Sequence, residues 1–153
     1  MPLDFDTRVG AYCVVVDHDR ILLAHVREGW FGADLGWTLP GGGMEPDETP
    51  GETARREMFE ETGLEVELGD LLAVDSFTVQ PHERLNPDDR DRALVSLRII
   101  YTARITGGTL RNEPDGSTDR AEWIPLEAVN ELQRVELVDV AVKALRDAQA
   151  ETA

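Results

Sequence analysis

The chain has 153 residues, enough for one domain with a sizeable core and too few for two, so we expect a single domain over residues 1–153. Its 31 acidic and 15 basic side chains give a net charge of −16, which argues against a nucleic-acid polymer or an anionic membrane as a partner. A small phosphorylated ligand is not excluded, because bound metal ions reverse the local field.

The single cysteine, Cys13, excludes an internal disulfide. It lies in the apolar run of residues 11–16, which predicts a buried thiol rather than a nucleophile. Residues 1–6 include two aspartates and no long apolar run, so we expect no secretory signal. No stretch is long enough to span a bilayer, and cytoplasmic residence is therefore the expected location.

The first predicted elements are two apolar strands joined by a polar turn. Residues 9–16 predict a buried strand, and residues 21–26 predict the returning strand of a hairpin. A loop carrying Trp30 and Phe31 follows, and then a short strand with Trp37 leads into three glycines. We expect Trp37 in the core, whereas both core packing and stacking on a base remain open for Trp30 and Phe31.

The next segment carries signals for a helix over residues 50–62. Thr49 with Glu52 three residues later is a capping box, and Gly63 suits a left-handed helix end. Helical spacing then defines two faces. The face expected to pack in a core holds Ala54, Met58, Phe59 and Thr62, and the other face holds Glu57, Glu60 and Glu61.

The clustered glutamates indicate a cation site. Like charges three or four residues apart cost about 0.2–0.5 kcal/mol per pair, and a divalent cation would offset that cost. Carboxylate oxygens are the ligands that magnesium and calcium prefer. Arg56 lies four residues from both Glu52 and Glu60, so we expect it to bridge them, although a direct phosphate contact remains open. A solvated acidic face is the alternative interpretation.

Residues 42–64 resemble the Nudix box, whose pattern is G-x5-E-x7-R-E-U-x-E-E-x-G-U, where U is an apolar residue. The fixed positions are all filled, by Gly42, Glu48, Arg56, Glu57, Glu60, Glu61 and Gly63, and the apolar positions by Met58 and Leu64. The chain departs from many members at Asp47, where a glycine is common.

The resemblance implies an α/β fold, namely an α/β/α sandwich with a mixed β-sheet between helices. It implies a hydrolase that cleaves the diphosphate linkage of a nucleoside diphosphate derivative, such as a nucleoside triphosphate, ADP-ribose or another nucleotide sugar, or a dinucleoside polyphosphate. Magnesium, or in some members manganese, would be the cofactor, and a homodimer is expected by analogy.

Carried onto this sequence, the resemblance also implies roles for single residues. Glu57, Glu60 and Glu61 would be metal ligands, a loop carbonyl near Gly42 would be a further ligand, and Arg56 would orient the glutamates. Separately, the run of glycines, which includes Gly42 and Gly43, would let the backbone approach the substrate closely.

The remainder of the chain predicts further strands, two loops and two helices. In chain order these are a strand over residues 65–79 that is broken near Gly69, a polar loop over 80–92, a strand over 94–105, a loop over 107–120, a short strand over 122–124, a short helix over 126–132 and a firmer helix over 136–149.

The general base has two candidates, Glu60 on the helix and Glu122 in the short strand. In the loop over residues 80–92, His82 and Arg84 are candidates for substrate contact, and plain surface is the other interpretation. A non-catalytic module that senses a nucleotide or binds a partner is the alternative to an enzyme.

Overall fold

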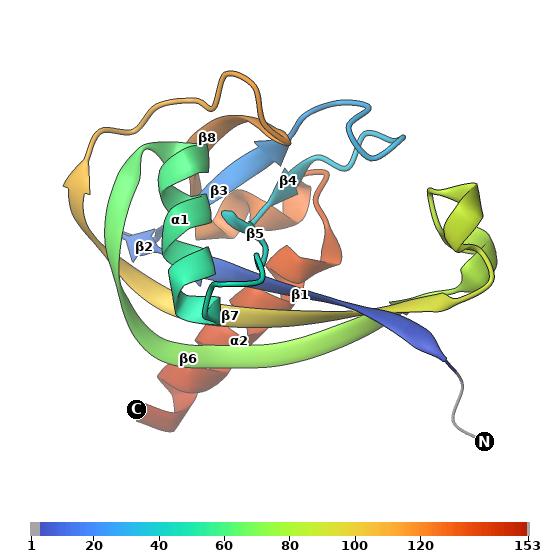
Figure 1. Cartoon of the computed structure of the whole chain (residues 1–153). Helices are drawn as coiled ribbons and strands as arrows, with labels where there is room; N and C mark the ends of the chain where they lie inside the picture. The colour runs from blue at the N-terminus through green and yellow to red at the C-terminus, as the bar shows by residue number, and fades with distance from the viewer. Residues whose placement is uncertain (1–3, 153) are drawn as a thin grey trace.

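The computed structural model describes residues 4–152 and contains two four-stranded sheets (Figure 1). The first sheet is mixed, since β1 runs parallel to β7 while β5 and β6 run antiparallel to their neighbours. Its strands in spatial order are β5 (Gly41–Gly43), β1 (Phe5–Val14), β7 (Ala93–Gly108) and β6 (Leu64–Val79). The antiparallel second sheet consists of β2 (Val16–Asp17), β3 (Arg20–Val26), β4 (Trp37–Thr38) and β8 (Thr118–Pro125).

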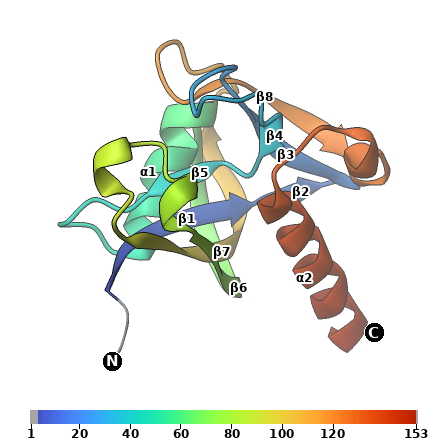
Figure 2. The same cartoon turned by 90° about the vertical axis from the view of Figure 1, so that its right-hand side faces the viewer.

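Helices α1 (Pro50–Thr62) and α2 (Glu136–Thr152) lie on opposite sides of the strands (Figure 2). The expected α/β sandwich with helices on both sides is therefore confirmed. The shorter 3₁₀ helices are η1 (Pro81–Glu83), η2 (Pro87–Asp89) and η3 (Leu126–Glu131), of which η3 falls in the predicted short helix. The expected mixed sheet has a second sheet beside it, because the predicted strand over residues 9–16 divides between β1 and β2.

The core has two halves, separated by β1 and β3. Successive side chains of a strand point to opposite faces. Ala11 and Cys13 pack with α1, whereas Tyr12 and Val14 pack in the cluster that includes α2. Both faces of β1 are thus buried there, which explains the uninterrupted apolar run in the sequence. The Cys13 thiol is fully buried, as predicted, and burial raises its pKa to about 12.

Helix α1 begins and ends where the sequence predicts. The Glu52 backbone N–H donates to the Thr49 hydroxyl at 3.2 Å, and the Glu52 carboxylate accepts from the Thr49 N–H at 3.3 Å. Gly63 ends the helix with a φ of 78°. The prediction that Phe59 is buried is wrong, because the residue is 46% exposed and its ring lies under the Arg111 guanidinium.

The reason lies in the stripe that α1 buries. Ala54, Met58 and Glu61 follow one another at steps of four and three residues and are all buried, whereas Phe59 falls beside that stripe. Glu61 therefore occupies a core position that the sequence assigned to an acidic face. This burial brings a carboxylate under the glycine strand β5.

Two further predictions concern strand β6 and the chain ends. The break expected near Gly69 is a set of register shifts between Leu68 and Ala73 within one continuous strand. Residues 1–3 of the N-terminal segment lie outside the described range.

None of the helices within residues 4–152 is long and apolar enough to cross a membrane.

Candidate active site

A cavity of about 920 Å³ lies where both sheets, α1 and three loops meet. The loops are residues 27–36, 80–92 and 109–117. Helix α1 contributes Glu57, Glu60 and Glu61 to its lining, and β5 contributes all three of its glycines. The acidic helix and the glycine run, neighbours in sequence, therefore face one shared space.

Glu61 is a buried carboxylate with one oxygen that lacks a hydrogen-bond partner among the residues that the structure describes. Its side chain is 2% exposed, and its Oε2 atom has no hydrogen-bond partner in the described part of the chain. Burial raises the pKa of Glu61 well above its ordinary range, and the neighbouring charge of Glu57 raises it further. The pKa of Glu57 is also raised, chiefly by burial, although Arg56 acts in the opposite direction. Among residues 4–152, Arg56 forms an ion pair with Glu57 but no cationic side chain pairs with Glu61.

Gly42 is required by the position of the Glu57 carboxylate. A Cβ atom on Gly42 would lie 2.7 Å from the Glu57 Cδ and 2.8 Å from Oε1, closer than real Cβ contacts. Its neighbour Gly43 has more room, with 3.5 Å to the nearest atom of Arg8. The box glycine thus provides space for a carboxylate beside the backbone.

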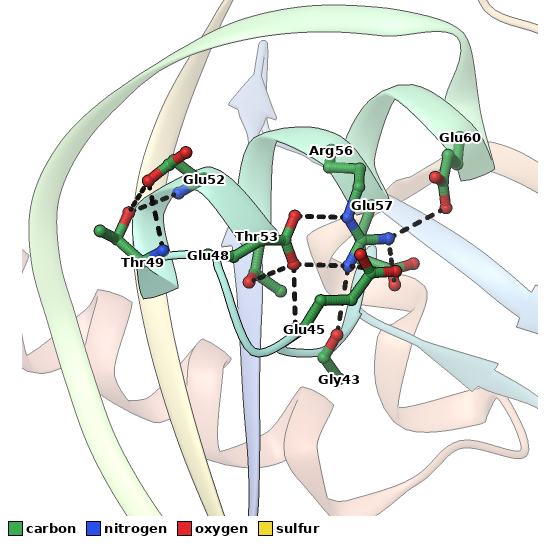
Figure 3. Close-up of polar contacts among 9 residues, drawn as sticks. All are labelled: Gly43, Glu45, Glu48, Thr49, Glu52, Thr53, Arg56, Glu57 and Glu60. Atoms are coloured by element: carbon green, nitrogen blue, oxygen red, sulfur yellow. Dashed lines mark hydrogen bonds and ion pairs between the residues drawn. The ribbon is translucent and has the colours of Figure 1, made fainter.

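Arg56 is the centre of the polar network around these glutamates (Figure 3). Its Nε and Nη2 donate to the two oxygens of Glu48 at 2.6 and 2.9 Å. Its Nη1 donates to Glu57 at 3.0 Å and to Glu60 at 3.3 Å. The expected bridge to Glu52 is wrong, because that carboxylate caps the helix instead. The Arg56 bond lowers the pKa of Glu48 to about 2, so Glu48 stays ionised.

The donor set fits a divalent cation, although the ligands do not yet converge. Over residues 4–152 no three His, Cys, Asp or Glu side chains lie close enough to hold a metal as they stand. Arg56 engages Glu57 and Glu60, so a cation would compete with it for their oxygens. The unpartnered Oε2 of Glu61 and the oxygen-only chemistry of the cluster are what a hard cation such as magnesium requires.

The structure does not bring every predicted residue to this cluster. Glu122 is exposed and pairs with Leu23, whose side chain faces the α2 half of the core, away from the acidic helix. His82 is exposed on η1 and does not line the cavity. Arg84 does line it, but its Nη1 donates to Asp6 at 2.6 Å. The roles of these residues stay predictions.

The sequence analysis missed Glu113, an acidic residue at the cavity. Glu113, in the loop over residues 109–117, lines the cavity, and its charge contributes to the raised pKa of Glu61. Its carboxylate accepts from the Thr118 hydroxyl at 2.9 Å. The Arg27 guanidinium anchors the loop by donating hydrogen bonds to its backbone carbonyls, the shortest being 2.8 Å to the Gly116 carbonyl. No spacing pattern distinguishes Glu113 from the other acidic residues.

The two aromatic residues left open by the sequence lie at the cavity. Trp30 and Phe31 line it and are 51% and 43% exposed. Trp37 is buried at 8% exposure, as predicted. Exposed aromatic rings at the edge of a cavity suit stacking on a planar group.

Comparison with known proteins gives a consistent result. The family model described as NUDIX domain matches residues 6–146. A MutT-like protein from Streptomyces ambofaciens is 34% identical over 119 residues, which are 77% of this chain and 64% of that protein. A human 8-oxo-dGDP phosphatase is 33% identical over 111 residues, which are 71% of this chain and 29% of that protein.

A solved NUDIX hydrolase from Nitrosomonas europaea shares the fold, with a TM-score of 0.74, 20% identity, and coverage of 94% of this chain and 90% of that one. The chain spans less than a third of the length of the first curated relatives that it matches. The family match extends well beyond the box, over both sheets and most of α2. The chain therefore belongs to the Nudix hydrolase family.

Proposed function

We propose that this protein is a magnesium-dependent hydrolase that cleaves the diphosphate linkage of a nucleoside diphosphate derivative. The observation that carries the proposal is the buried carboxylate of Glu61 beside the partly buried carboxylate of Glu57, at a cavity large enough for a nucleotide. A diphosphate is itself an anion, so cations are needed between it and these carboxylates. Glu57, Glu60 and Glu61 would hold magnesium or manganese.

When bound, the metal would neutralise phosphate charge and lower the pKa of a bound water. The protein supplies the positions of the groups around it. Arg56 fixes the Glu57 and Glu60 carboxylates through hydrogen bonds, and Gly42 leaves space for the Glu57 carboxylate beside the strand. Fixing these groups in advance lowers the activation barrier, because the entropic cost of positioning them is not incurred during the reaction.

Attack of water on phosphorus requires a proton acceptor. Glu60 remains a candidate base, and Glu113 joins it because it lines the same cavity from the loop over residues 109–117. The hydrogen bond from Thr118 and the anchoring of the loop by Arg27 hold Glu113 in place. Glu122 is less suited, because its side chain lies on the α2 face of β8.

The phosphate chemistry belongs to α1 and β5, whereas the group attached to the phosphates would meet the loops. Trp30 and Phe31 could stack on a nucleobase. Among the relatives, one is named for 8-oxo-dGDP, and we extend to this chain only the class of nucleoside phosphate. Nucleoside triphosphates and ADP-ribose are the first substrates to examine.

The test is a product analysis with purified protein and magnesium. Nucleoside triphosphates, 8-oxo-dGDP, ADP-ribose and dinucleoside polyphosphates are incubated in ¹⁸O-labelled water, and products are identified by mass spectrometry. We expect at least one compound to be split into a nucleoside monophosphate and a second phosphate-containing product, with one ¹⁸O atom in whichever product carries the attacked phosphorus. Absence of turnover together with tight nucleotide binding would favour a sensing or partner-binding module instead.

The matched variants are Glu57→Gln and Glu151→Gln. Both remove one carboxylate charge, but Glu151 is exposed near the end of α2, outside the cavity lining. Glu57→Gln should lower kcat more than about a hundredfold, because even outer-shell partners of a metal contribute 10- to 100-fold. Equal turnover of the two folded variants at saturating magnesium would contradict the role of Glu57.

A further inference from the structure

One of the three arginines at the cavity lacks a carboxylate partner. Arg84 donates to Asp6 at 2.6 Å, and Arg98 makes two bonds to Asp75 at 2.7 and 2.9 Å, so both charges are neutralised locally. For Arg8 no carboxylate oxygen lies within 4.0 Å among residues 4–152. Among the arginines that line the cavity, Arg8 is thus the one whose charge is not neutralised by a carboxylate in the described chain.

The local backbone is built around this arginine. One face of β1 carries Arg8, Gly10 and Tyr12, because residues two apart in a strand point to the same side. The Tyr12 ring lies across two glycines, since a Cβ on Gly10 would be 2.8 Å from its hydroxyl oxygen and a Cβ on Gly41 would be 2.5 Å from its Cδ1. The ring thereby reaches along the strand, and Arg8 Nη1 donates to its hydroxyl at 3.3 Å.

That hydrogen bond is the only one that the Arg8 side chain makes in the described chain, so most of the guanidinium N–H donors remain available. The guanidinium lies beside β5, 3.5 Å from the position of a Cβ on Gly43. The next residue of β5, Gly42, contacts the Glu57 carboxylate. Successive strand residues point to opposite faces, so Arg8 and Glu57 lie against opposite sides of the narrow edge strand β5. Both nevertheless line the same cavity, which therefore has a cationic and an acidic part.

We propose that Arg8, positioned by Tyr12, binds a phosphoryl group of the nucleotide substrate. The inference rests on the proposed function and adds an anion-binding subsite to it. A planar guanidinium pairs with phosphate oxygens through two parallel hydrogen bonds. The phosphate chain would thus lie between cations held by α1 and the guanidinium on β1. We therefore expect cleavage of a nucleoside triphosphate, whose third phosphoryl group can reach Arg8, to depend on Arg8 more than cleavage of a substrate with two phosphoryl groups.

The test compares Arg8→Gln and Arg8→Lys with Arg146→Gln, an equal charge change at an exposed site on α2 outside the cavity lining. Affinity for magnesium pyrophosphate is measured by isothermal titration calorimetry, and kcat and KM are measured on a nucleotide that the wild type cleaves. Arg8→Gln should weaken pyrophosphate binding and raise KM by about 10- to 100-fold, as for loss of a charged hydrogen bond. Its kcat should change less than its KM.

Arg8→Lys should recover part of the affinity, because charge returns without the planar pair of donors. Tyr12→Phe should raise KM by a smaller factor than Arg8→Gln, since the guanidinium loses its positioning bond but keeps its charge. Circular dichroism checks that each variant is folded.

Equal pyrophosphate affinity and KM for Arg8→Gln and Arg146→Gln would overturn the subsite. The same holds if the wild type binds no pyrophosphate. Failure of the proposed function gives a different result, since the wild type would then cleave no nucleotide at all. Loss of turnover only in Glu57→Gln, with Arg8→Gln unaffected, would leave the hydrolase assignment standing and reject the subsite alone.

Discussion

Arg56 and Glu48 form a two-point ion pair, with Nε–Oε2 at 2.6 Å and Nη2–Oε1 at 2.9 Å. The remaining nitrogen of the same guanidinium donates to Glu57 and Glu60. Glu48 therefore fixes the residue that fixes two of the proposed metal ligands. Glu48 is therefore important to the site, although it makes no direct hydrogen bond to Glu57, Glu60 or Glu61.

A double-mutant cycle tests this coupling. Arg56→Lys and Glu48→Gln should each lower kcat/KM by about 10- to 100-fold, as outer-shell changes do. The double variant should be little worse than the poorer single variant, because both changes release the same contacts. Asp147→Asn, which breaks the exposed Lys143 pair on α2, serves as the control and should leave kcat/KM unchanged. Additive losses would show that the two residues act separately.

Two neighbouring glycines offer a steric comparison. Gly42→Ala would push a methyl group to within 2.7 Å of the Glu57 Cδ, whereas Gly43→Ala would meet its nearest atom at 3.5 Å. We expect the larger fall in kcat for Gly42→Ala, together with weaker magnesium binding measured by calorimetry. A greater effect at Gly43 would mean that contact with substrate, rather than space for Glu57, dominates at this strand.

Glu61 should make the metal-free protein sensitive to pH. Its folded-state pKa is raised above the usual 4.5 by burial, so its contribution to stability is complete below 4.5 and is lost as pH rises through the folded-state value. Glu61→Gln should therefore raise the Tm of the metal-free protein at neutral pH. Magnesium should raise the Tm of the wild type by mass action and that of the variant much less. Thermal unfolding with and without a chelator measures both effects, and an equal magnesium response would contradict them.

Glu113 and Glu122 can be compared as candidate bases with one substitution each. Glu113→Gln should lower kcat by about 10²- to 10⁴-fold, the usual contribution of a general base, and Glu122→Gln should have little effect. The expectation follows from position, since only Glu113 lines the cavity. Single-turnover kinetics at saturating substrate separates the chemical step from binding. The reverse order of effects would return the role to Glu122.

Local signals explain which predictions succeeded. The capping box at Thr49, the helix end at Gly63 and the box spacing are set by residues close in sequence, and each has the predicted geometry. The α/β class followed from strand and helix order and from the family resemblance.

Features that depend on tertiary packing were not accessible in the same way. Helical spacing placed Phe59 in the core and Glu61 on the acidic face, but neighbouring elements decided which stripe of α1 is buried. Spacing also left Glu52 equally able to cap the helix or pair with Arg56. Glu113 is distant in sequence from α1 and β5, and only the tertiary fold places it at their cavity. A homodimer, cytoplasmic location and a single domain over residues 1–153 stay predictions.

The lone cysteine offers a built-in reporter of helix detachment. Its Sγ lies 3.6 Å from the Ala54 carbonyl, at the contact between β1 and α1, and it is fully buried. Thiol reagents attack the thiolate, and burial both raises the pKa of Cys13 to about 12 and shields its Sγ beside α1, so we expect slow labelling until α1 lifts away from the sheet. The alkylation rate then measures how often that detachment occurs. Magnesium with nucleotide should slow it, because ions held by α1 beside β5 would clamp the two elements together.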